Sequence, residues 1–274
     1  PFTKEDLNLL TVMANVAAIR IEHARLNEVE QAEQLQRKEL DQAAQIQRSL
    51  LPAQAPVVAG YSLSGYNAPC RTVGGDYYDF LEFPDGKIGL IVADVSGKGL
   101  PASLMMTSLQ ARVQVLFEEG SGLAFKMTRL NSAISRNCPA GKFITVFLGV
   151  LDPATGVFNY SNAGHNPPLI VRATGAVDKL ASGGGPVMGV LANFLYQESS
   201  VVLNQGDVLV LYSDGVTESF APDRDEEFGE ERVAEVVAKI KGLMQEYGLS
   251  TSDLDLKGKS AKTQRAKKAN FKPA

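Results

Sequence analysis

The chain has 274 residues, of which 45% are hydrophobic and 21% charged, and its formal net charge is −4. These values are typical of an ordinary soluble protein with one large domain or two modest ones. The net charge does not favour a nucleic acid or a membrane surface as partner, and no stretch is long and apolar enough to span a bilayer. Two cysteines, Cys70 and Cys138, form neither a metal-binding spacing nor a disulfide framework, as expected for a protein of the reducing cytoplasm.

The two ends of the chain differ from its middle. The chain begins at Pro1, without a methionine and inside a helical pattern, so we expect it to be a fragment of a longer protein. From Leu249 to the end, seven Lys and Arg oppose two Asp, a local charge of +5 that leaves −9 for the remainder. Few apolar residues accompany these charges, so residues 249–274 are expected to form a basic, disordered tail.

Residues 4–51 contain no glycine or proline and predict one long helix, which Pro52 and Pro56 end. The first part of this helix has apolar residues at helical spacing, which predicts one buried face: Leu7, Leu10, Ala14, Ala17, Ala18, Ile21 and Ala24. Beyond these, a heptad repeat has three polar residues among its eight seam positions: Leu26, Val29, Glu33, Gln36, Leu40, Ala43, Gln47 and Leu50. This pattern fits a weak dimeric coiled coil and a single solvated helix equally well.

From Tyr61 onward, the hydrophobic period is mostly that of strands. Two expected strands, residues 76–83 and 87–95, are joined by a hairpin turn centred on Asp85. Pro101 opens a helix as its first residue. The other expected strands are residues 61–70, 143–151, 157–161, 168–173, 177–181, 196–203 and 207–212, and the other expected helices are about residues 123–137 and 230–245.

Two strand-rich blocks around a helix pair, closed by a helix, predict an α+β fold. We expect an α/β/β/α sandwich of two antiparallel sheets flanked by helices, preceded by the long N-terminal helix. In the second helix of the pair, Phe125, Leu130 and Ile134 are expected to face inward, and residues 182–186 are expected to form a glycine-rich loop. A parallel, doubly wound sheet is not favoured, because long helices do not alternate with the strands.

Three aspartates, Asp76, Asp94 and Asp214, stand inside or just beyond apolar runs. A buried carboxylate is costly unless something compensates its charge. Because Asp76 and Asp94 are both nine residues from Asp85, we expect them to face each other across an antiparallel pair. Each aspartate taken singly is better explained as a turn residue that caps backbone amides. Together they favour a site for hard divalent cations, with the Val95 carbonyl as a further candidate ligand.

Four motifs, in this order along the chain, resemble those of the PPM-type (type 2C-like) protein serine/threonine phosphatases, in the branch named after SpoIIE and RsbU. They are Gly74-Gly75-Asp76-Tyr77-Tyr78-Asp79, Ala93-Asp94-Val95-Ser96-Gly97-Lys98-Gly99, Asn162-Ala163-Gly164-His165-Asn166-Pro167-Pro168 and Tyr212-Ser213-Asp214-Gly215-Val216-Thr217-Glu218. The resemblance covers about residues 43–241. Residues 2–10 and 17–26 resemble the last helix of a GAF-like sensor domain.

The resemblance implies a domain order and a chemistry. Residues 1–26 would end a sensor domain, 27–56 would form the linker helix, and 57–248 would form the phosphatase domain, with the tail from 249. Two Mn²⁺ or Mg²⁺ ions would be held by Asp76 between them, by Asp94 and the Val95 carbonyl on one side, and by Asp214. The ions would activate a shared water for phosphoryl transfer. The implied substrate is a phosphorylated anti-anti-sigma-type regulator, with sensor control and dimerisation acting through the linker helix.

Two motif residues receive other expected roles. Asp79 is expected either to hold a metal-bound water or to be structural. His165 is expected to order its loop beside the sheet and is left out of the catalytic set.

The chain departs from the family pattern near its end. Family members close with an Asp-Asp pair that supplies a metal ligand, and here only Asp253 and Asp255 stand in its place, with no strand pattern after them. The alternative hypothesis is therefore a catalytically impaired domain that serves as a dimerisation or binding module. A third, nucleotide binding at the turn of residues 96–99, lacks the full pattern of a nucleotide loop.

Overall fold

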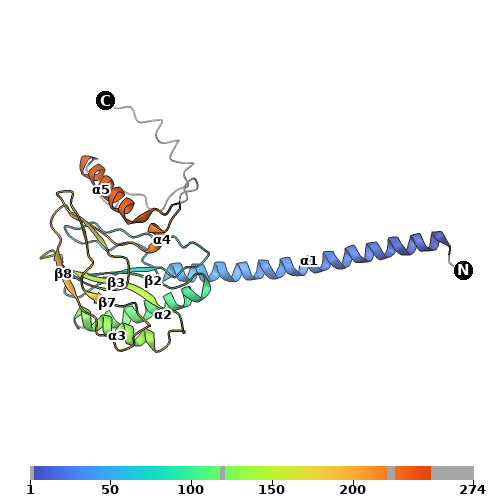
Figure 1. Ribbon diagram of the computed structural model, residues 1–274, viewed down its shortest axis with the longest axis horizontal. Helices are drawn as coiled ribbons and strands as arrows, with labels where there is room; N and C mark the ends of the chain where they lie inside the picture. The colour runs from blue at the N-terminus through green and yellow to red at the C-terminus, as the bar shows by residue number, and fades with distance from the viewer. Residues whose placement is uncertain (1–2, 118–120, 221–225, 248–274) are drawn as a thin grey trace, which may run out of the picture. The chain divides into compact units, whose positions relative to one another are not determined.

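The computed structural model describes residues 3–117, 121–220 and 226–247, the last five of these in backbone only (Figure 1). The chain divides into two compact units, Pro1–Arg48 and Ser49–Ala274. None of the helices in the described part of the chain has both the length and the apolar composition that crossing a membrane requires.

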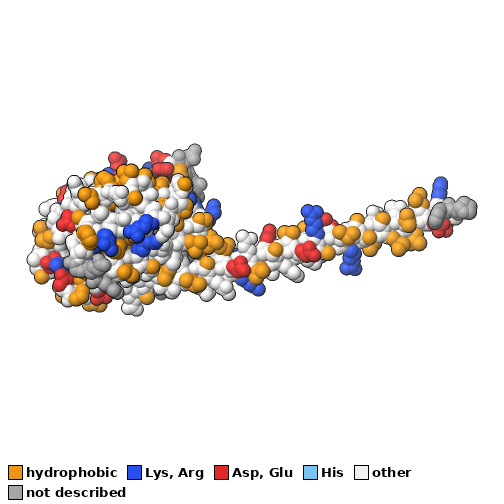
Figure 2. Space-filling model, turned by 90° about the horizontal axis from the view of Figure 1, so that it is seen from below, with side chains coloured by type: hydrophobic (Ala, Val, Ile, Leu, Met, Phe, Trp, Pro, Cys, Tyr) orange, Lys and Arg blue, Asp and Glu red, His pale blue; other side chains and the backbone are white. Residues whose placement is uncertain are grey.

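The first unit is formed by α1 (Lys4–Ser49), which confirms the predicted long helix. The predicted burial of its first part is wrong for this unit. Leu7, Leu10 and Ile21 are 63%, 67% and 70% exposed, and hydrophobic side chains are visible along the helix surface (Figure 2). A lone helix has no second element against which an apolar face can pack.

Six strands form the first sheet of the second unit. Their order is β1 (Tyr77–Glu82), β2 (Ile88–Val95), β3 (Ile144–Leu151), β4 (Val157–Ala163) and β7 (Gly184–Gly185), with β8 (Ser199–Val202) also paired to β4. Neighbouring strands are antiparallel except β4 and β7, which are parallel. The short β7 corrects the expected loop at residues 182–186. A Cβ on Gly184 would lie 1.8 Å from the Asn162 carbonyl oxygen, so this close pairing requires glycine.

Three short strands form the second sheet, in the order β6 (Val177–Lys179), β5 (Leu169–Val171) and β9 (Val208–Val210). Both pairs are antiparallel. The carboxyl end of β9 leads directly into the motif that contains Asp214.

Three apolar clusters separate four layers, which confirms the predicted α/β/β/α sandwich. The first cluster lies between the six-stranded sheet and the helix pair α2 (Leu100–Phe117) and α3 (Leu123–Ser135), which lie side by side (Figure 1). The second joins the two sheets through side chains such as Phe147, Phe158 and Ile170. The third packs Leu169 and Tyr212 against Val233 of α5 (Gly229–Tyr247).

Two further sequence predictions are wrong. Residues 61–70 form no strand beyond an isolated bridge from Tyr61 to Val58; Tyr61 and Leu63 instead pack against the cluster between the sheets. In α3, the buried stripe includes Met127, Leu130 and Ile134, whereas Phe125 is 50% exposed. Phe125 lies off this stripe, and the Arg129 guanidinium lies 5.7 Å from its ring centroid.

Candidate metal centre

The hairpin of β1 and β2 brings Asp76 and Asp94 to one end of the six-stranded sheet. Its turn forms at Gly86, whose φ of 81° favours glycine and whose amide donates to the Phe83 carbonyl at 2.9 Å. The register pairs Tyr77 with Ala93, so the next positions outward are Asp76 and Asp94. This confirms the predicted facing arrangement, with Asp76 just before the strand instead of inside it.

Gly75 makes room for the oxygen atoms at this end of the sheet. A Cβ on Gly75 would lie 2.7 Å from the Val95 carbonyl oxygen and 3.2 Å from Asp94 Oδ1. The Val95 carbonyl and the Asp94 carboxylate therefore both lie beside this glycine. The close approach leaves no space for a side chain.

If the site has the phosphatase activity that the four motifs imply, replacing Gly75 with alanine should lower that activity about 100-fold, because the added methyl group must displace the Val95 carbonyl or the Asp94 side chain. The measurement is kcat at saturating Mn²⁺, together with the melting temperature. Gly86→Ala is the control: unlike Gly75, Gly86 has open space around its Cβ position, and it lies at the far end of the hairpin. That variant should lose stability through its positive φ and keep its activity.

Asp214 reaches the same site from the second sheet. It begins the single-turn helix α4 (Asp214–Thr217), and its carbonyl accepts from the Glu218 amide at 2.7 Å and from Thr217 Oγ1 at 3.1 Å. The preceding residue, Ser213, lies beside the Asp76 carboxyl group and partly offsets the effect of burial on its pKa. The two sheets therefore meet at these carboxylates.

The electrostatics of the site are those of uncompensated acids. Burial, together with the negative charges of Asp76, Asp214 and Glu218, raises the pKa of Asp94 to about 7. Burial also raises the pKa of Asp76, whose Oδ1 is buried without a hydrogen-bond partner. A buried acceptor of this kind is costly unless a cation or another donor satisfies it.

The donor chemistry fits a hard divalent cation. Carboxylate and carbonyl oxygens are the ligands that Mg²⁺ and Mn²⁺ prefer, and Mg²⁺ retains several waters. However, no three His, Cys, Asp or Glu side chains of the described residues gather closely enough to hold one ion by themselves. An ion here would therefore be held by fewer carboxylates, with the Val95 carbonyl and water completing its coordination. The expected replacements for the family's last acidic ligand, Asp253 and Asp255, lie outside the described residues.

Asp79 has a structural environment. It is buried and accepts hydrogen bonds from the Tyr77 hydroxyl at 2.8 Å, the Gln114 amide at 2.7 Å and the Phe80 amide at 2.8 Å. These contacts join β1 to α2. Of the two roles expected for Asp79, a structural role and the binding of a metal-bound water, these contacts favour the structural role.

His165 is buried away from solvent, in line with its exclusion from the catalytic set. Its Nδ1 lies 2.9 Å from Thr145 Oγ1 and its Nε2 lies 3.1 Å from the Tyr212 carbonyl oxygen. Burial lowers the pKa of His165 to about 4. The imidazole is therefore neutral near pH 7 and is occupied at both nitrogens.

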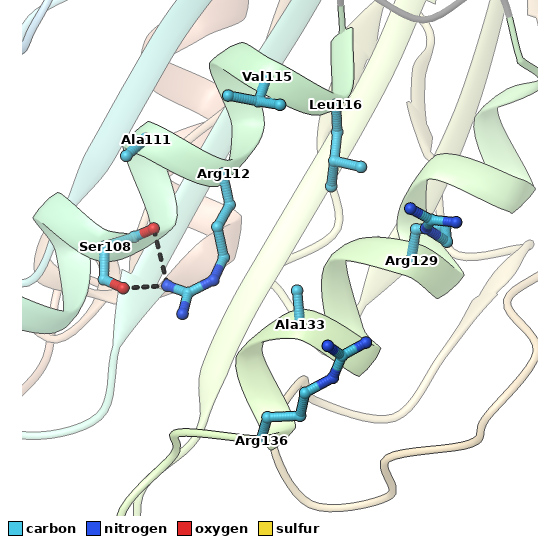
Figure 3. A pocket seen from close by; sticks show the side chains of 8 residues that line it. All are labelled: Ser108, Ala111, Arg112, Val115, Leu116, Arg129, Ala133 and Arg136. Atoms are coloured by element: carbon cyan, nitrogen blue, oxygen red, sulfur yellow. Dashed lines mark hydrogen bonds between the residues drawn. The ribbon is translucent and has the colours of Figure 1, made fainter.

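A groove of about 550 Å³ lies elsewhere, between α2 and α3 (Figure 3). It is lined by Ser108, Ala111, Arg112, Val115, Leu116, Arg129, Ala133 and Arg136. None of the three aspartates lines it, so this groove is not part of the candidate metal centre.

Sequence reasoning missed several neighbours of the aspartates. Ser213 and Glu218 stand inside a recognised motif, but their proximity to Asp76 and Asp94 depends on how the two sheets pack. Arg71 is exposed beside the turn that follows Asp94: a Cβ on Gly99 would lie 3.7 Å from its Nη1. The only sequence signal for Arg71 is its positive charge and its position five residues before Asp76.

Comparison with known families identifies the domain. Residues 84–249 match the family described as Stage II sporulation protein E (SpoIIE). The chain belongs to the SpoIIE family. The matched region contains Asp94 and Asp214, whereas Asp76 precedes it, so the place of Asp76 in the site rests on the hairpin register and on its contacts.

The relatives of this SpoIIE-family chain include a protein named as a phosphoserine phosphatase. The phosphoserine phosphatase RsbU of Bacillus subtilis is 30% identical over 210 residues, which cover 77% of this chain and 62% of that protein. Protein IcfG of Synechocystis is 28% identical over 256 residues, or 84% of this chain and 37% of IcfG. The chain therefore spans less than two thirds of the length of either relative.

Solved structures agree with the fold of the SpoIIE-family domain. The RsbU and RsbW domains of Rv1364c from Mycobacterium tuberculosis match with a TM-score of 0.54 and 30% identity, over 64% of this chain and 48% of that one. The SiaA-PP2C domain of Pseudomonas aeruginosa matches with a TM-score of 0.64 and 22% identity, over 76% of this chain and 83% of that one. These matches confirm the expected phosphatase fold.

Proposed function

We propose that this chain is a divalent-metal-dependent phosphoserine and phosphothreonine protein phosphatase of the bacterial cytoplasm. The observation that carries the proposal is the buried Oδ1 of Asp76, which has no hydrogen-bond partner and lies beside Asp94 and Asp214 within a SpoIIE-family domain. The name of RsbU as a phosphoserine phosphatase supports the same reaction. The alternative of an inactive binding module gains no support from these relatives.

Asp76, Asp94, Asp214 and the Val95 carbonyl would hold the metal ions, with Asp76 between them. When bound, two such ions supply an activated water at neutral pH and neutralise charge on the phosphoryl oxygens. The residues of the chain have simpler tasks. Asp94 must be ionised, Gly75 must leave the Val95 carbonyl accessible, and Ser213 lies beside the Asp76 carboxyl group.

The proposed substrate is the phosphorylated form of a small anti-anti-sigma-type regulatory protein. The experiment is release of phosphate from such a phosphoserine protein, with Mn²⁺, with Mg²⁺ and with EDTA. We expect hydrolysis with either ion, none with EDTA, and no hydrolysis of a phosphotyrosine peptide. A chain that hydrolyses neither the phosphoprotein nor p-nitrophenyl phosphate with any of these ions would contradict the proposal.

Control by a GAF-like sensor and dimerisation through residues 27–56 complete the proposed function. The seam residues Leu26 and Val29 of α1, which are 58% and 51% exposed, support a helix that associates with a second copy. In a Cys70→Ser background, Leu40→Cys at a seam position should form disulfide-linked dimers readily. Lys38→Cys, on another face of the helix, should do so much less. Equal cross-linking of the two variants would argue against this seam.

A further inference from the structure

His165 connects two elements that carry candidate metal ligands. It is only 5% exposed, and its ring lies between Thr145 on β3 and the Tyr212 carbonyl that follows β9. Thr145 pairs directly with Asp94 in the sheet register, and its Oγ1 lies 3.4 Å from the Asp94 main-chain oxygen. Tyr212 stands two residues before Asp214. The ring therefore spans from the six-stranded sheet to the three-stranded sheet beside the site.

The hydrogen-bonding partners determine which nitrogen of His165 is protonated. A carbonyl oxygen can only accept, so Nε2 carries the hydrogen and donates to Tyr212. Nδ1 is then the acceptor, and the Thr145 hydroxyl donates to it. Each end of the ring makes one directed contact, and rotation of the ring would break both.

The loop around His165 is held without the ring. The Asn162 side chain donates to the His165 carbonyl at 2.9 Å and accepts from the His165 amide at 2.7 Å. Gly164 adopts a φ of 68°, and a Cβ there would lie 2.5 Å from Val187 Cγ1. These contacts hold the loop without the imidazole ring. The two hydrogen bonds of the ring therefore have a structural role other than ordering the loop.

That role follows from the charges at the site. Asp94 and Asp214 carry like charges when both are ionised and lie close enough to repel each other. Without a restraint, this repulsion favours separation of the two sheet ends whenever no cation lies between them. A hydrogen-bonded connection across the gap opposes the separation and keeps the oxygens prepared for an ion.

We propose that His165 is a positioning residue that fixes the spacing between Asp94 and Asp214 by joining Thr145 to the Tyr212 carbonyl. This inference rests on the proposed metal-dependent function of the site. It assigns His165 no contact with substrate and no proton transfer.

The test is the affinity of the full chain for Mn²⁺ alone, measured by titration calorimetry without substrate. Thr145→Val keeps the side-chain shape and removes the hydroxyl. His165→Gln retains a donor near the position of Nε2 and loses the acceptor for Thr145. Each change should weaken Mn²⁺ binding about 10-fold, as is usual when groups behind the ligands are lost. Thr145→Ser, which retains the hydroxyl, should bind within about 2-fold of the wild type.

The double variant distinguishes one connection from two separate effects. If the ring and the hydroxyl form a single link, Thr145→Val with His165→Gln should weaken binding about 10-fold, as each single change does. Tyr196→Phe is the matched control, because it also removes one buried hydroxyl, which donates to the Pro186 carbonyl at 2.7 Å. Neither Tyr196 nor Pro186 stands in a motif that contains one of the three aspartates. It should lower the melting temperature and leave Mn²⁺ affinity unchanged.

Unchanged Mn²⁺ affinity in Thr145→Val overturns the inference, and so does a loss of about 100-fold in the double variant. If His165→Gln fails to fold, Thr145→Val and Thr145→Ser decide the question by themselves. Absence of Mn²⁺ binding in the wild type would instead overturn the proposed function, and this inference with it.

Discussion

Asp76→Asn should abolish the proposed phosphatase activity and leave the metal-free chain at least as stable as the wild type. The loss of activity should be on the order of 1,000-fold or more, equivalent to about 4 kcal/mol of transition-state stabilisation. The neutral amide cannot serve as a charged ligand between two cations. Stability should not fall, because the change removes a carboxylate whose pKa burial raises and whose Oδ1 has no partner.

The measurement combines initial rates at saturating Mn²⁺ with thermal unfolding in EDTA. Asp79→Asn is the matched control, because Asp79 is also a buried acid of the same motif. Its carboxylate accepts from three donors, and an amide placed there would turn a donor toward one of them. Asp79→Asn should therefore lower the melting temperature and retain activity. If Asp76→Asn destabilises the chain as Asp79→Asn does, its loss of activity would not identify a ligand.

The facing pair of Asp76 and Asp94 could be predicted because it depends on local structure. A Pro-Asp-Gly turn between two strand patterns determines the register, and counting from Asp85 gives the observed pairing. Asp214 is different. Its approach to Asp76 depends on how β9 pairs with β5 and how the second sheet stacks on the first, and these strands have only three residues each. Such short strands carry little periodicity, so the sequence indicated Asp214 only by its place beyond an apolar run and by the family motif, without a register.

The wrong predictions have a common cause: periodicity shows which residues are apolar, but not which helix or strand packs against them. The helical spacing of Leu7, Leu10 and Ile21 describes one apolar face correctly, but the element that would cover it is absent from the unit that α1 forms. In α3, Phe125 is apolar yet lies outside the buried stripe, because the sheet contacts only one side of the helix. Residues 61–70 are extended and partly packed, but no neighbouring strand offers them a ladder.

The affinity of the chain for Mn²⁺ should rise about 50-fold between pH 5 and pH 7, and only about 2-fold more at higher pH. Asp94 must release its proton before it can bind a cation, and its pKa lies at about 7. Below that pKa, each pH unit leaves about 10-fold less of the ionised form, so protons compete with the metal. The measurement is calorimetric titration with Mn²⁺ at several pH values. An affinity that changes less than about 3-fold over this range would contradict the assigned pKa.

Stability without metal provides the second half of this test. Because the pKa of Asp94 is raised on folding, the folded chain retains a proton between about pH 4 and pH 7 that the unfolded chain has lost. Asp94 therefore lowers the free energy of unfolding progressively as the pH rises through this window. His165 acts in the opposite sense, because its pKa is lowered to about 4, so the wild-type curve alone does not isolate Asp94. In EDTA, Asp94→Asn should match the wild type near pH 4 and exceed its melting temperature at pH 8, and a constant difference across this range would contradict the assignment.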